Sequence, residues 1–325
     1  MKIAFYSGDM GKKYASHIIE LLKGRLPQHQ YNHLEQVENP DVWHCMAPHA
    51  SLRFIPNAHR SVISLLDMRF ITHPEIFSLY ERLFLFPLYR YHCRHAARLI
   101  THNSTSKRRL VDSLGLDASH VEICSALVAR RDDSTISADD LLAFRAKFEL
   151  PDNYILIAGE MDTMHGHTTM LHAVLSSPHP FNAVIYGRRT THSDVLLQAV
   201  RDANAANRIQ FIYELDPQEV SLLYRLSMVV LYFPTFESSV MPIVEALHQH
   251  VPMVLSDTPL NRETAAQAAI YVEPYDQEAL VDALKRVLYN ESFRGQLIAQ
   301  CWVESKRYSD EQLAQQLAQI YESVP

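Results

Sequence analysis

The stretch MVVLYFPTFESSVMPIVEAL, from Met228 to Leu247, decides the fold class. It opens with a continuous apolar run of β-branched and aromatic residues that ends at Pro234, which is typical of a buried strand. A polar loop follows, and Pro242 is then a natural first residue for an apolar helical segment. A buried strand that passes directly into a helix is the repeating unit of an α/β fold with a parallel sheet.

The same alternation of short apolar runs and helical segments occurs twice along the chain. In the first half we expect strands at residues 2–6, 42–45, 61–66, 98–101 and 120–124, with helices such as 12–23 and 75–97. In the second half we expect strands at residues 154–158, 182–186, 208–213, 228–233, 252–255 and 269–272. Strands that alternate with helices imply parallel sheets with right-handed crossovers, so the sequence predicts two Rossmann-like, doubly wound halves.

A length of 325 residues favours two domains of about 150 residues each. The turn-forming sequence Leu150-Pro151-Asp152-Asn153 places the boundary between domains 1–150 and 151–307, and residues 308–325 are expected to form a helix that packs back toward the first domain. The composition, 47% hydrophobic and 21% charged, excludes disordered, collagen-like and coiled-coil chains. No apolar run has the length of a signal-peptide core or a membrane span, and the four cysteines are scattered, so we expect a cytoplasmic protein.

Charge is unevenly distributed along the chain. Residues 1–150 carry a net charge of +3 and residues 151–325 one of −10, and the stretch Arg53–Arg109 holds ten basic residues against three acidic ones. Such a basic region suits an anionic membrane, a phosphorylated acceptor or nucleic acid, and it is equally compatible with a solvated helix face. Within it, Glu75–Ile100 mixes aromatic residues with arginines, which fits either a helix at a membrane interface or a core helix bent at Pro87.

Glycine is rare in this chain, with only 8 residues, and five of them follow predicted strands. These five are Gly8, Gly11, Gly159, Gly166 and Gly187. Their position is explained either by backbone that approaches a ligand closely or by tight strand-to-helix turns.

The loop after the strand at 228–233 combines an anion site with two carboxylates. The backbone N–H groups of residues 238–241 and the helix that follows offer several donors to a phosphate-sized anion. Glu237 lies on this loop, and Glu245 is expected in the first helical turn. Carboxylates next to an anion site are suited to accept hydrogen bonds from sugar hydroxyls, although Glu245 alone could simply complement the helix dipole.

The spacing of Glu237 and Glu245, in the frame Pro-x-x-Glu-x-x-x-x-Pro-x-x-Glu-Ala, resembles the signature of retaining glycosyltransferases of the GT-B fold, family four. The resemblance continues through VPMVLSDTPLNRETAAQAAIYVEPYDQEALVDALKRVL and covers YILIAGEMDTMHGHTTMLHAV, VIYGRR and RIQFIYELDPQEVSLLYRLS. In the first half, SGDMGKKYASHIIELL resembles the acceptor-side glycine loop and helix, and SLLDMRF and RLITHNSTSKRRLVDSLGL resemble later segments.

This resemblance implies two domains that face each other across a cleft, with a UDP- or GDP-linked sugar on the second and a saccharide or lipid-linked acceptor on the first. Transfer would retain configuration and need no metal or further cofactor, and no nucleic acid would take part. The catalytic candidates that the resemblance implies are Glu237, Asp67 and His165. The implied donor-binding candidates are Gly11, Gly159, Arg188, Arg189, Tyr213, Leu215, Ser238, Ser239, Val240, Met241 and Glu245.

Three positions depart from the family pattern. The Arg and Lys that neutralise the diphosphate correspond to Met164 and His165, and histidine is mostly neutral at pH 7. Arg188 and Arg189 are placed to supply the missing charge. The His-Asp pair of the acceptor domain here includes Leu66, and His250 replaces a glycine, so that backbone turn is expected to differ.

Other function classes fit less well. The histidine pairs His92/His95, His165/His167 and His248/His250 lack a carboxylate or cysteine at a metal-ligand spacing. The glycine pattern after the first strand lacks the third glycine of a dinucleotide fingerprint, and neither a Walker loop nor a Gly-x-Ser-x-Gly elbow occurs.

The sequence therefore predicts a glycosyltransferase of bacterial surface-polysaccharide assembly, located in the cytoplasm or bound peripherally to the inner membrane face through residues 53–109. The alternative is a non-catalytic GT-B protein that binds a nucleotide-sugar or a partner protein.

Overall fold

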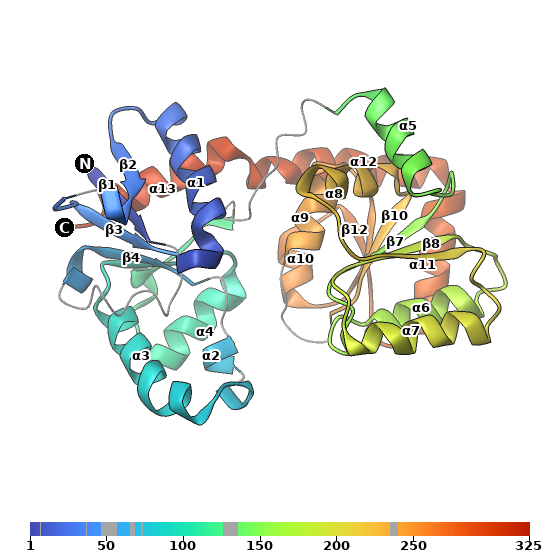
Figure 1. Cartoon of the computed structure of the whole chain (residues 1–325), viewed down its shortest axis with the longest axis horizontal. Coiled ribbons are helices and arrows are strands. Elements are labelled where there is room, and N and C mark those ends of the chain that lie inside the picture. Colours follow the sequence, from blue (N-terminus) through green and yellow to red (C-terminus); the bar gives the residue numbers. More distant parts are fainter. Residues whose placement is uncertain are drawn as a thin grey trace. The chain divides into compact units, whose positions relative to one another are not determined.

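A computed structural model of the chain describes residues 1–6, 8–36, 38–46, 57–65, 69–72, 74–125, 136–234 and 240–325. These residues form two compact units (Figure 1). Unit 1 consists of residues 1–129 and 307–325, and unit 2 of residues 130–306. Each unit is built on one six-stranded parallel sheet, as the alternating sequence pattern predicts.

The sheet of unit 1 has the strand order β2-β1-β3-β4-β5-β6. Its strands are β1 (Lys2–Tyr6), β2 (Gln30–His33), β3 (Val42–Cys45), β4 (Ser61–Ser64), β5 (Arg98–Thr101) and β6 (Val121–Ile123). Its helices are α1 (Gly8–Arg25), α2 (Arg69–Thr72), α3 (Phe86–His95), α4 (Ser104–Leu114) and α13 (Asp310–Glu322). Shorter turns of helix are η1 (Leu34–Gln36), η3 (Pro74–Ile76), η4 (Glu81–Leu85), η5 (Ala118–His120) and η7 (Lys306–Tyr308). One face of the sheet packs on α1 and α13, and the other packs on α2, α3 and α4.

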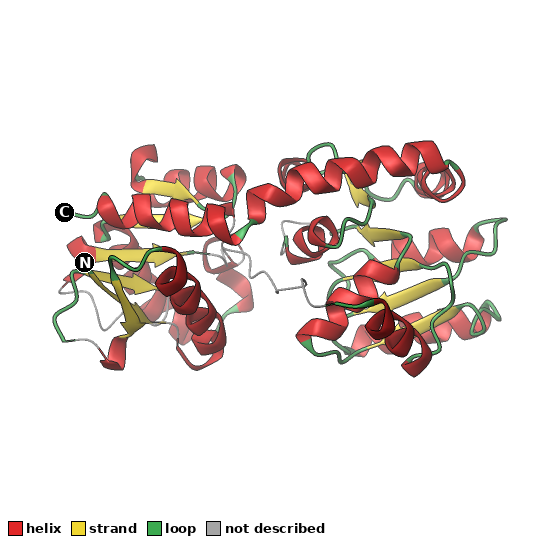
Figure 2. Ribbon diagram, turned by 90° about the horizontal axis from the view of Figure 1, so that it is seen from above, coloured by secondary structure: helices red, strands yellow, loops and turns green. Residues whose placement is uncertain are grey.

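The sheet of unit 2 has the strand order β12-β11-β10-β7-β8-β9. Its strands are β7 (Ile155–Ala158), β8 (Ala183–Tyr186), β9 (Ile209–Ile212), β10 (Val229–Tyr232), β11 (Met253–Ser256) and β12 (Ala269–Val272). Its helices are α5 (Ala138–Lys147), α6 (His167–Ser176), α7 (Thr191–Asp202), α8 (Pro217–Leu226), α9 (Met241–His248), α10 (Pro259–Ala265), α11 (Gln277–Tyr289) and α12 (Glu291–Ser305). Helices cover both faces of this sheet, which is the doubly wound arrangement (Figure 2).

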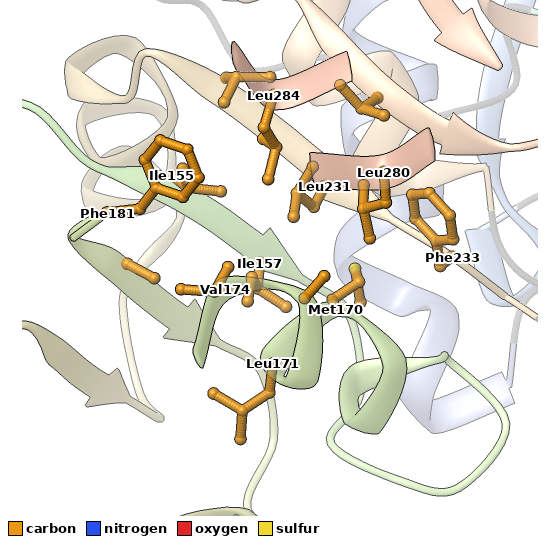
Figure 3. Packing of buried hydrophobic residues seen from close by; sticks show 14 of the residues in the cluster. Ile155, Ile157, Met170, Leu171, Val174, Phe181, Leu231, Phe233, Leu280 and Leu284 are labelled. Carbon is orange, nitrogen blue, oxygen red and sulfur yellow. The ribbon is translucent and has the colours of Figure 1, made fainter. Parts of the chain in front are cut away.

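The core of unit 2 explains why its strands read as continuous apolar runs. Ile155, Ile157 and Leu231 point from β7 and β10 toward α6 and α11, where they meet residues such as Met170 and Leu280 (Figure 3). All four residues of β7 and all four of β10 are buried, because alternate side chains enter the core on opposite faces of the sheet.

Several local expectations are corrected by the structure. Gly8 and Gly11 lie inside α1, which begins at Gly8, so they are not in a loop after β1. Helix α5 belongs to unit 2 rather than to the first half, because Lys147 pairs with Glu219 at 2.5 Å and Gln210 donates to the backbone carbonyl of Phe148 at 2.7 Å. Strand β2 was not expected, since Gln30–His33 is mostly polar and only Tyr31 is buried.

The last helix is tied to the sheet of unit 1 by a buried polar network. His44 on β3 lies with its Nδ1 2.7 Å from the hydroxyl of Tyr321 on α13 and its Nε2 2.7 Å from the hydroxyl of Ser64 on β4. His44 is completely buried, and desolvation lowers its pKa to about 3, so the ring is neutral at pH 7. A neutral imidazole has one donor and one acceptor, and both are used here.

Replacement of Tyr321 by Phe is expected to destabilise the protein by about 1–3 kcal/mol, because it leaves one buried nitrogen of His44 without a partner. Urea unfolding at pH 7 measures the change. Tyr289→Phe is the matched control, since Tyr289 is 64% exposed and its loss of a hydroxyl should change the unfolding free energy little. An equal effect of the two substitutions would contradict a role of the network in holding α13.

Candidate functional site

The strand order of unit 2 defines one place where a ligand crevice is expected. β7 and β10 are neighbours in the sheet, and the chain leaves them toward opposite faces. From β7 it passes into α6, which packs with α7 and α11, and from β10 it continues toward α9, which packs with α8 and α12. In open parallel sheets, ligands bind outside the carboxyl ends of the strands at such a topological switch point.

Three glycines bring the backbone of separate segments together at this end of the sheet. Gly159 and Gly166 flank the loop after β7 with φ angles of +123° and +71°, which non-glycine residues rarely adopt. A Cβ on Gly166 would lie 2.0 Å from the carbonyl oxygen of Phe233, and a Cβ on Gly187 would lie 1.8 Å from the carbonyl oxygen of Gly159. Close backbone packing therefore accounts for Gly166 and Gly187 without a ligand.

His165 is held in place by a carboxylate of its own loop. Its Nδ1 lies 2.7 Å from Asp162 Oδ1, and the same oxygen accepts hydrogen bonds from the backbone amides of Met164 and His165 at 2.8 and 3.0 Å. Burial raises the pKa of the Asp162 carboxyl, but the hydrogen bonds outweigh burial and leave this pKa below its usual value. Since an ionised carboxylate only accepts, Nδ1 carries a proton and a positive ring requires a second proton on Nε2.

The loop after β7 also meets the end of β10. The ring centroid of His165 lies 6.3 Å from that of Tyr232, and a Cβ on Gly159 would lie 3.3 Å from the same tyrosine ring. The predicted residues His165 and Gly159 therefore lie close to Tyr232, at the end of the strand that leads into the predicted motif loop, although they precede it in sequence by 67 and 73 residues.

The N-termini of α6 and α9 differ from the other helix starts of unit 2. Gly166 and Val240, the residues before α6 and α9, provide no side-chain hydrogen bond to the first turn. Each of the other helices of this unit has a side-chain cap, supplied by Ser137, Thr190, Asp216, Thr258, Asp276 and Asn290. The two helices that begin at the switch point therefore have amide groups that a side-chain cap does not satisfy, and such groups favour anions.

Val240 and Met241 lie at the start of α9, as the sequence predicts, with Val240 buried and Met241 exposed. Glu245 is the fifth residue of α9 and not part of its first turn, so simple complementation of the helix dipole does not explain it. Its carboxylate accepts a hydrogen bond from the Ser221 hydroxyl of α8 at 2.9 Å. The half-buried carboxylate is thereby oriented, and a carboxylate has acceptor sites for more than one donor. Glu237, Ser238 and Ser239 lie outside the described residues.

Arg188 and Arg189 follow β8 and are each already engaged in an exposed ion pair. Arg188 lies 3.1 Å from Glu160, and Arg189 lies 3.0 Å from Asp194 and over the ring of Tyr213. Their charges are therefore partly compensated by these carboxylates. Tyr213 follows β9, and its buried hydroxyl has no hydrogen-bond partner among the residues that the structure describes. Leu215 lies two residues further on and is half-buried.

In unit 1, Gly11 lies in the first turns of α1, directly after β1. Asp67 and its neighbour Leu66 lie outside the described residues.

At the third departure from the family pattern, His250 adopts a φ of +57°, so the turn keeps the conformation that glycine favours, although a different turn was expected. The ring of His250 stacks on Trp302 at 3.5 Å with an interplanar angle of 8°.

The sequence did not predict that the side chain of His167 is buried. It is the first residue of α6, its side chain is completely buried, and neither ring nitrogen has a hydrogen-bond partner within the described parts of the chain. Desolvation, reinforced by nearby His165, lowers its pKa to about 3. The His-x-His spacing drew attention to it only as a weak metal candidate. No group of three or more His, Cys, Asp or Glu that could hold a metal ion occurs in the described ranges.

Comparison with known proteins agrees with this geometry. Residues 140–301, which lie within unit 2, match the family described as "Glycosyl transferases group 1". The chain is 23% identical over 235 residues to the "O-antigen chain mannosyltransferase RfbU" of Salmonella typhimurium, covering 72% of this chain and 62% of that protein. It is 22% identical over 268 residues to the "O-antigen chain mannosyltransferase B" of Escherichia coli, covering 81% and 70%. The match to the first relative thus spans less than two thirds of that protein.

The fold is similar to that of a solved structure, Anabaena Alr3699/HepE in complex with UDP, with a TM-score of 0.77 and 16% identity over 99% of this chain and 100% of that one. The match over residues 140–301 thus supports membership of the Glycosyl transferases group 1 family, and the whole chain has the GT-B fold. No helix among the described residues is both long enough and apolar enough to span a bilayer.

Replacement of His167 by Leu is expected to leave stability at pH 7.5 unchanged or increased, because it removes a buried polar ring without partners. It should also weaken the loss of stability in acid. The native pKa of His167 is depressed, so the unfolded state binds its proton first, and stability is lost as pH falls below about 6.5. Each such histidine contributes a slope of at most about 1.4 kcal/mol per pH unit.

Urea unfolding of both proteins between pH 7.5 and 5 measures this difference in slope. His172→Gln is the matched control, since His172 is exposed on the same helix and should leave the slope unchanged. A His167→Leu variant with the wild-type slope would show that His167 is not buried and neutral in solution.

Proposed function

We propose that this protein is a retaining glycosyltransferase that moves a hexose-type sugar from a UDP- or GDP-linked donor to a saccharide or lipid-linked glycan acceptor. Unit 2 would bind the donor and unit 1 the acceptor. The family match supports sugar transfer, the relatives' names support mannose transfer to O-antigen chains, and the UDP complex of the similar structure supports a nucleoside-diphosphate donor.

The observation that carries this proposal is the pair of helices without side-chain caps at the switch point of unit 2. α6 begins at the close contact of Gly166 with Phe233, directly after β10, and α9 is the next helix after that strand. The ring centroid of His165 lies 6.3 Å from that of Tyr232, the last residue of β10. A diphosphate placed there would accept hydrogen bonds from backbone amides of both helices, and the helix dipoles would favour its charge. Glu245, fixed by Ser221, would accept hydrogen bonds from ribose hydroxyls, and Tyr213 would lie near the base.

In the transfer step, an acceptor hydroxyl would attack the anomeric carbon from the side of the leaving group. The bond between that carbon and the diphosphate oxygen breaks, and the departing diphosphate takes the proton of the hydroxyl. Both bonds lie on the same face of the sugar, so the configuration is retained. The protein would contribute by positioning the reactants and by stabilising the charge that develops on the diphosphate. Glu237 would contact the transferred sugar, and Asp67 would contribute from unit 1.

His165 would then act as a weaker cation than lysine. Its Nδ1 proton is directed to Asp162, so only protonation at Nε2 would give the ring a positive charge toward a phosphate. The amides of α6 and α9 would carry more of the electrostatic stabilisation, and the ion-paired Arg188 and Arg189 would contribute less than uncommitted arginines.

A thermal-shift panel with UDP, GDP, ADP, CDP and their sugars tests donor binding. A ligand that binds only the native state stabilises it by about 2.7 kcal/mol at a hundredfold excess over its dissociation constant, so one nucleotide class should raise the melting temperature clearly. With the matching donor, Glu237→Ala should abolish transfer but keep the fold. Glu278→Ala, at an exposed position of α11, is the control and should retain activity.

Absence of a shift with every nucleotide would overturn the donor proposal. A clear shift without turnover of any acceptor would favour the non-catalytic alternative, which the replacement of lysine by His165 already motivates. Product with inverted configuration would contradict retention and the front-face mechanism, but not sugar transfer itself.

The substitution His165→Lys is expected to strengthen binding of the matching nucleoside diphosphate by roughly tenfold, because a permanent charge next to a phosphate adds on the order of 1.4 kcal/mol. Titration calorimetry at pH 7.5 measures the change. Thr163→Lys adds the same charge at an exposed position of the same loop and should have a smaller effect. Equal effects of both variants, or unchanged affinity, would show that residue 165 does not face the diphosphate.

A further inference from the structure

The helical connection between β4 and β5 in unit 1 has two apolar faces. Residues 79–95 form a continuous helix that includes the π-helical turn η4 and then α3, and Pro87 is the second residue after η4 ends. A proline removes one backbone donor and crowds the preceding turn, which explains the local widening. Phe86, Tyr89 and Cys93 pack in the core below the sheet. The inward face of this helix therefore packs as expected for a core helix, one of the two interpretations that the sequence allows.

The outward face of the same helix is also apolar. Six large hydrophobic side chains in this segment are between 42% and 67% exposed, namely Leu79, Tyr80, Leu83, Phe84, Leu88 and Tyr91. A helix on the surface of a globular protein normally presents charged and polar residues to solvent. Six such side chains exposed on one helix are more than the scattered single exposures that are normal on a protein surface, and they indicate an interaction surface.

Arginines accompany this apolar face. Arg82, Arg90 and Arg94 are exposed and line one pocket of ≈ 460 Å³. The remaining lining residues are Pro74, Phe86, Pro87, Tyr91 and His95. Within the described residues, none of these three arginines forms an ion pair with a carboxylate. The one carboxylate inside the helix, Glu81, is engaged by the backbone and side chain of Ser78 at its start. The pocket therefore keeps an uncompensated positive charge beside apolar side chains.

The position of this surface in unit 1 is informative. In a parallel sheet the crossover helix runs back along the strands, so η4, at its beginning, lies toward the carboxyl ends of β4 and its neighbours. That end of a doubly wound sheet is where a ligand of this unit is expected. Figure 1 shows the helix on the same side of the sheet as α2 and α4.

We propose that this surface, comprising the six exposed hydrophobic residues and Arg82, Arg90 and Arg94, docks the protein onto a phospholipid membrane that contains anionic lipid. Leucine, phenylalanine and tyrosine side chains insert at the headgroup level, where aromatic residues with a polar end are favoured, and the arginines contact lipid phosphates. The pocket receives an anionic headgroup. A symmetric dimer through the same surface is disfavoured, because it would place the arginine clusters of two copies against each other.

Vesicle binding of the full-length protein tests this proposal without any sugar donor or acceptor, so its outcome is separate from that of the transferase proposal. Co-sedimentation is measured with vesicles of phosphatidylcholine alone and of phosphatidylcholine with 30% phosphatidylglycerol, a composition chosen to be on the order of the anionic content of natural membranes. We expect binding to the anionic vesicles, and weaker binding in high salt because the charges are screened. L83E/F84E and R82E/R90E should each reduce the affinity at least tenfold.

The matched control variants carry the same kinds of substitution, hydrophobic residue to glutamate and arginine to glutamate, at exposed positions of unit 2. L142E/V195E replaces two hydrophobic residues that are 64% and 59% exposed, and Arg201→Glu reverses an exposed charge on α7. These variants should bind vesicles as the wild type does, and circular dichroism should show all variants folded. Light scattering gives the oligomeric state of each.

Failure of the wild type to bind anionic vesicles would overturn the proposal, as would equal binding by L83E/F84E and the wild type. A wild-type dimer that L83E/F84E converts to a monomer, without vesicle binding by either, would assign the surface to self-association instead. Equal binding to neutral and anionic vesicles would contradict the role of the arginines.

Discussion

The contact between the loop after β7 and the end of β10 is the constraint on which the rest of unit 2 depends. Gly166 packs so closely against the carbonyl of Phe233 that no side chain fits between them, and Gly187 packs in the same way against Gly159. The side chain of Phe233 belongs to the core that Ile157 and Leu231 share. The start of α6 therefore cannot move away from β10 without opening the core, and this packing and the hydrogen bonds to Asp162 together fix the position of His165.

This packing is accompanied by unsatisfied polar groups at the same place. α6 and α9 begin without side-chain caps, and the first residue of α6, His167, has two buried nitrogens without partners among the described residues. A helix without a side-chain cap is less stable than a capped one, and a buried polar ring without partners is less favourable than an apolar side chain at the same position. They coincide at the switch point, while the helices that start elsewhere in unit 2 are capped. Polar groups left unsatisfied in this way are expected where a ligand completes the structure.

Much of the fold could be predicted from the sequence because the apolar runs of buried parallel strands are local signals. Eleven of the twelve strands were expected, and β2 was missed because a polar edge strand with one buried tyrosine carries no such signal. Features that depend on tertiary contacts were not predictable. The turn at residue 150 exists, with a φ of +51° at Glu149, but α5 joins unit 2 through contacts with α8 and the β9 strand that no local pattern reveals.

For the candidate site, too, the sequence predicted the positions of residues along the chain but not the contacts of their side chains. The strand pattern predicted that Gly159 and His165 follow β7 and that Val240 precedes the helix after β10, and the structure has them there. The engagement of Arg188 and Arg189 by Glu160 and Asp194 depends on side-chain directions, which the sequence does not give. The burial of His167 depends in addition on how closely the loop packs on β10.

The departures from the family pattern have different physical consequences. A residue other than glycine in the left-handed region costs about 1–2 kcal/mol, and His250 offsets part of this cost by stacking on Trp302, a contact worth about 0.5–1.5 kcal/mol. The turn after α9 thus keeps a glycine-type conformation, and Glu245, one turn earlier on the same helix, keeps its place against Ser221. His165 keeps its position but not the permanent charge of a lysine. These positions keep a backbone conformation compatible with the family pattern while the side-chain charge changes, so in the proposed donor site an anionic group would depend more on helix amides than on side-chain cations.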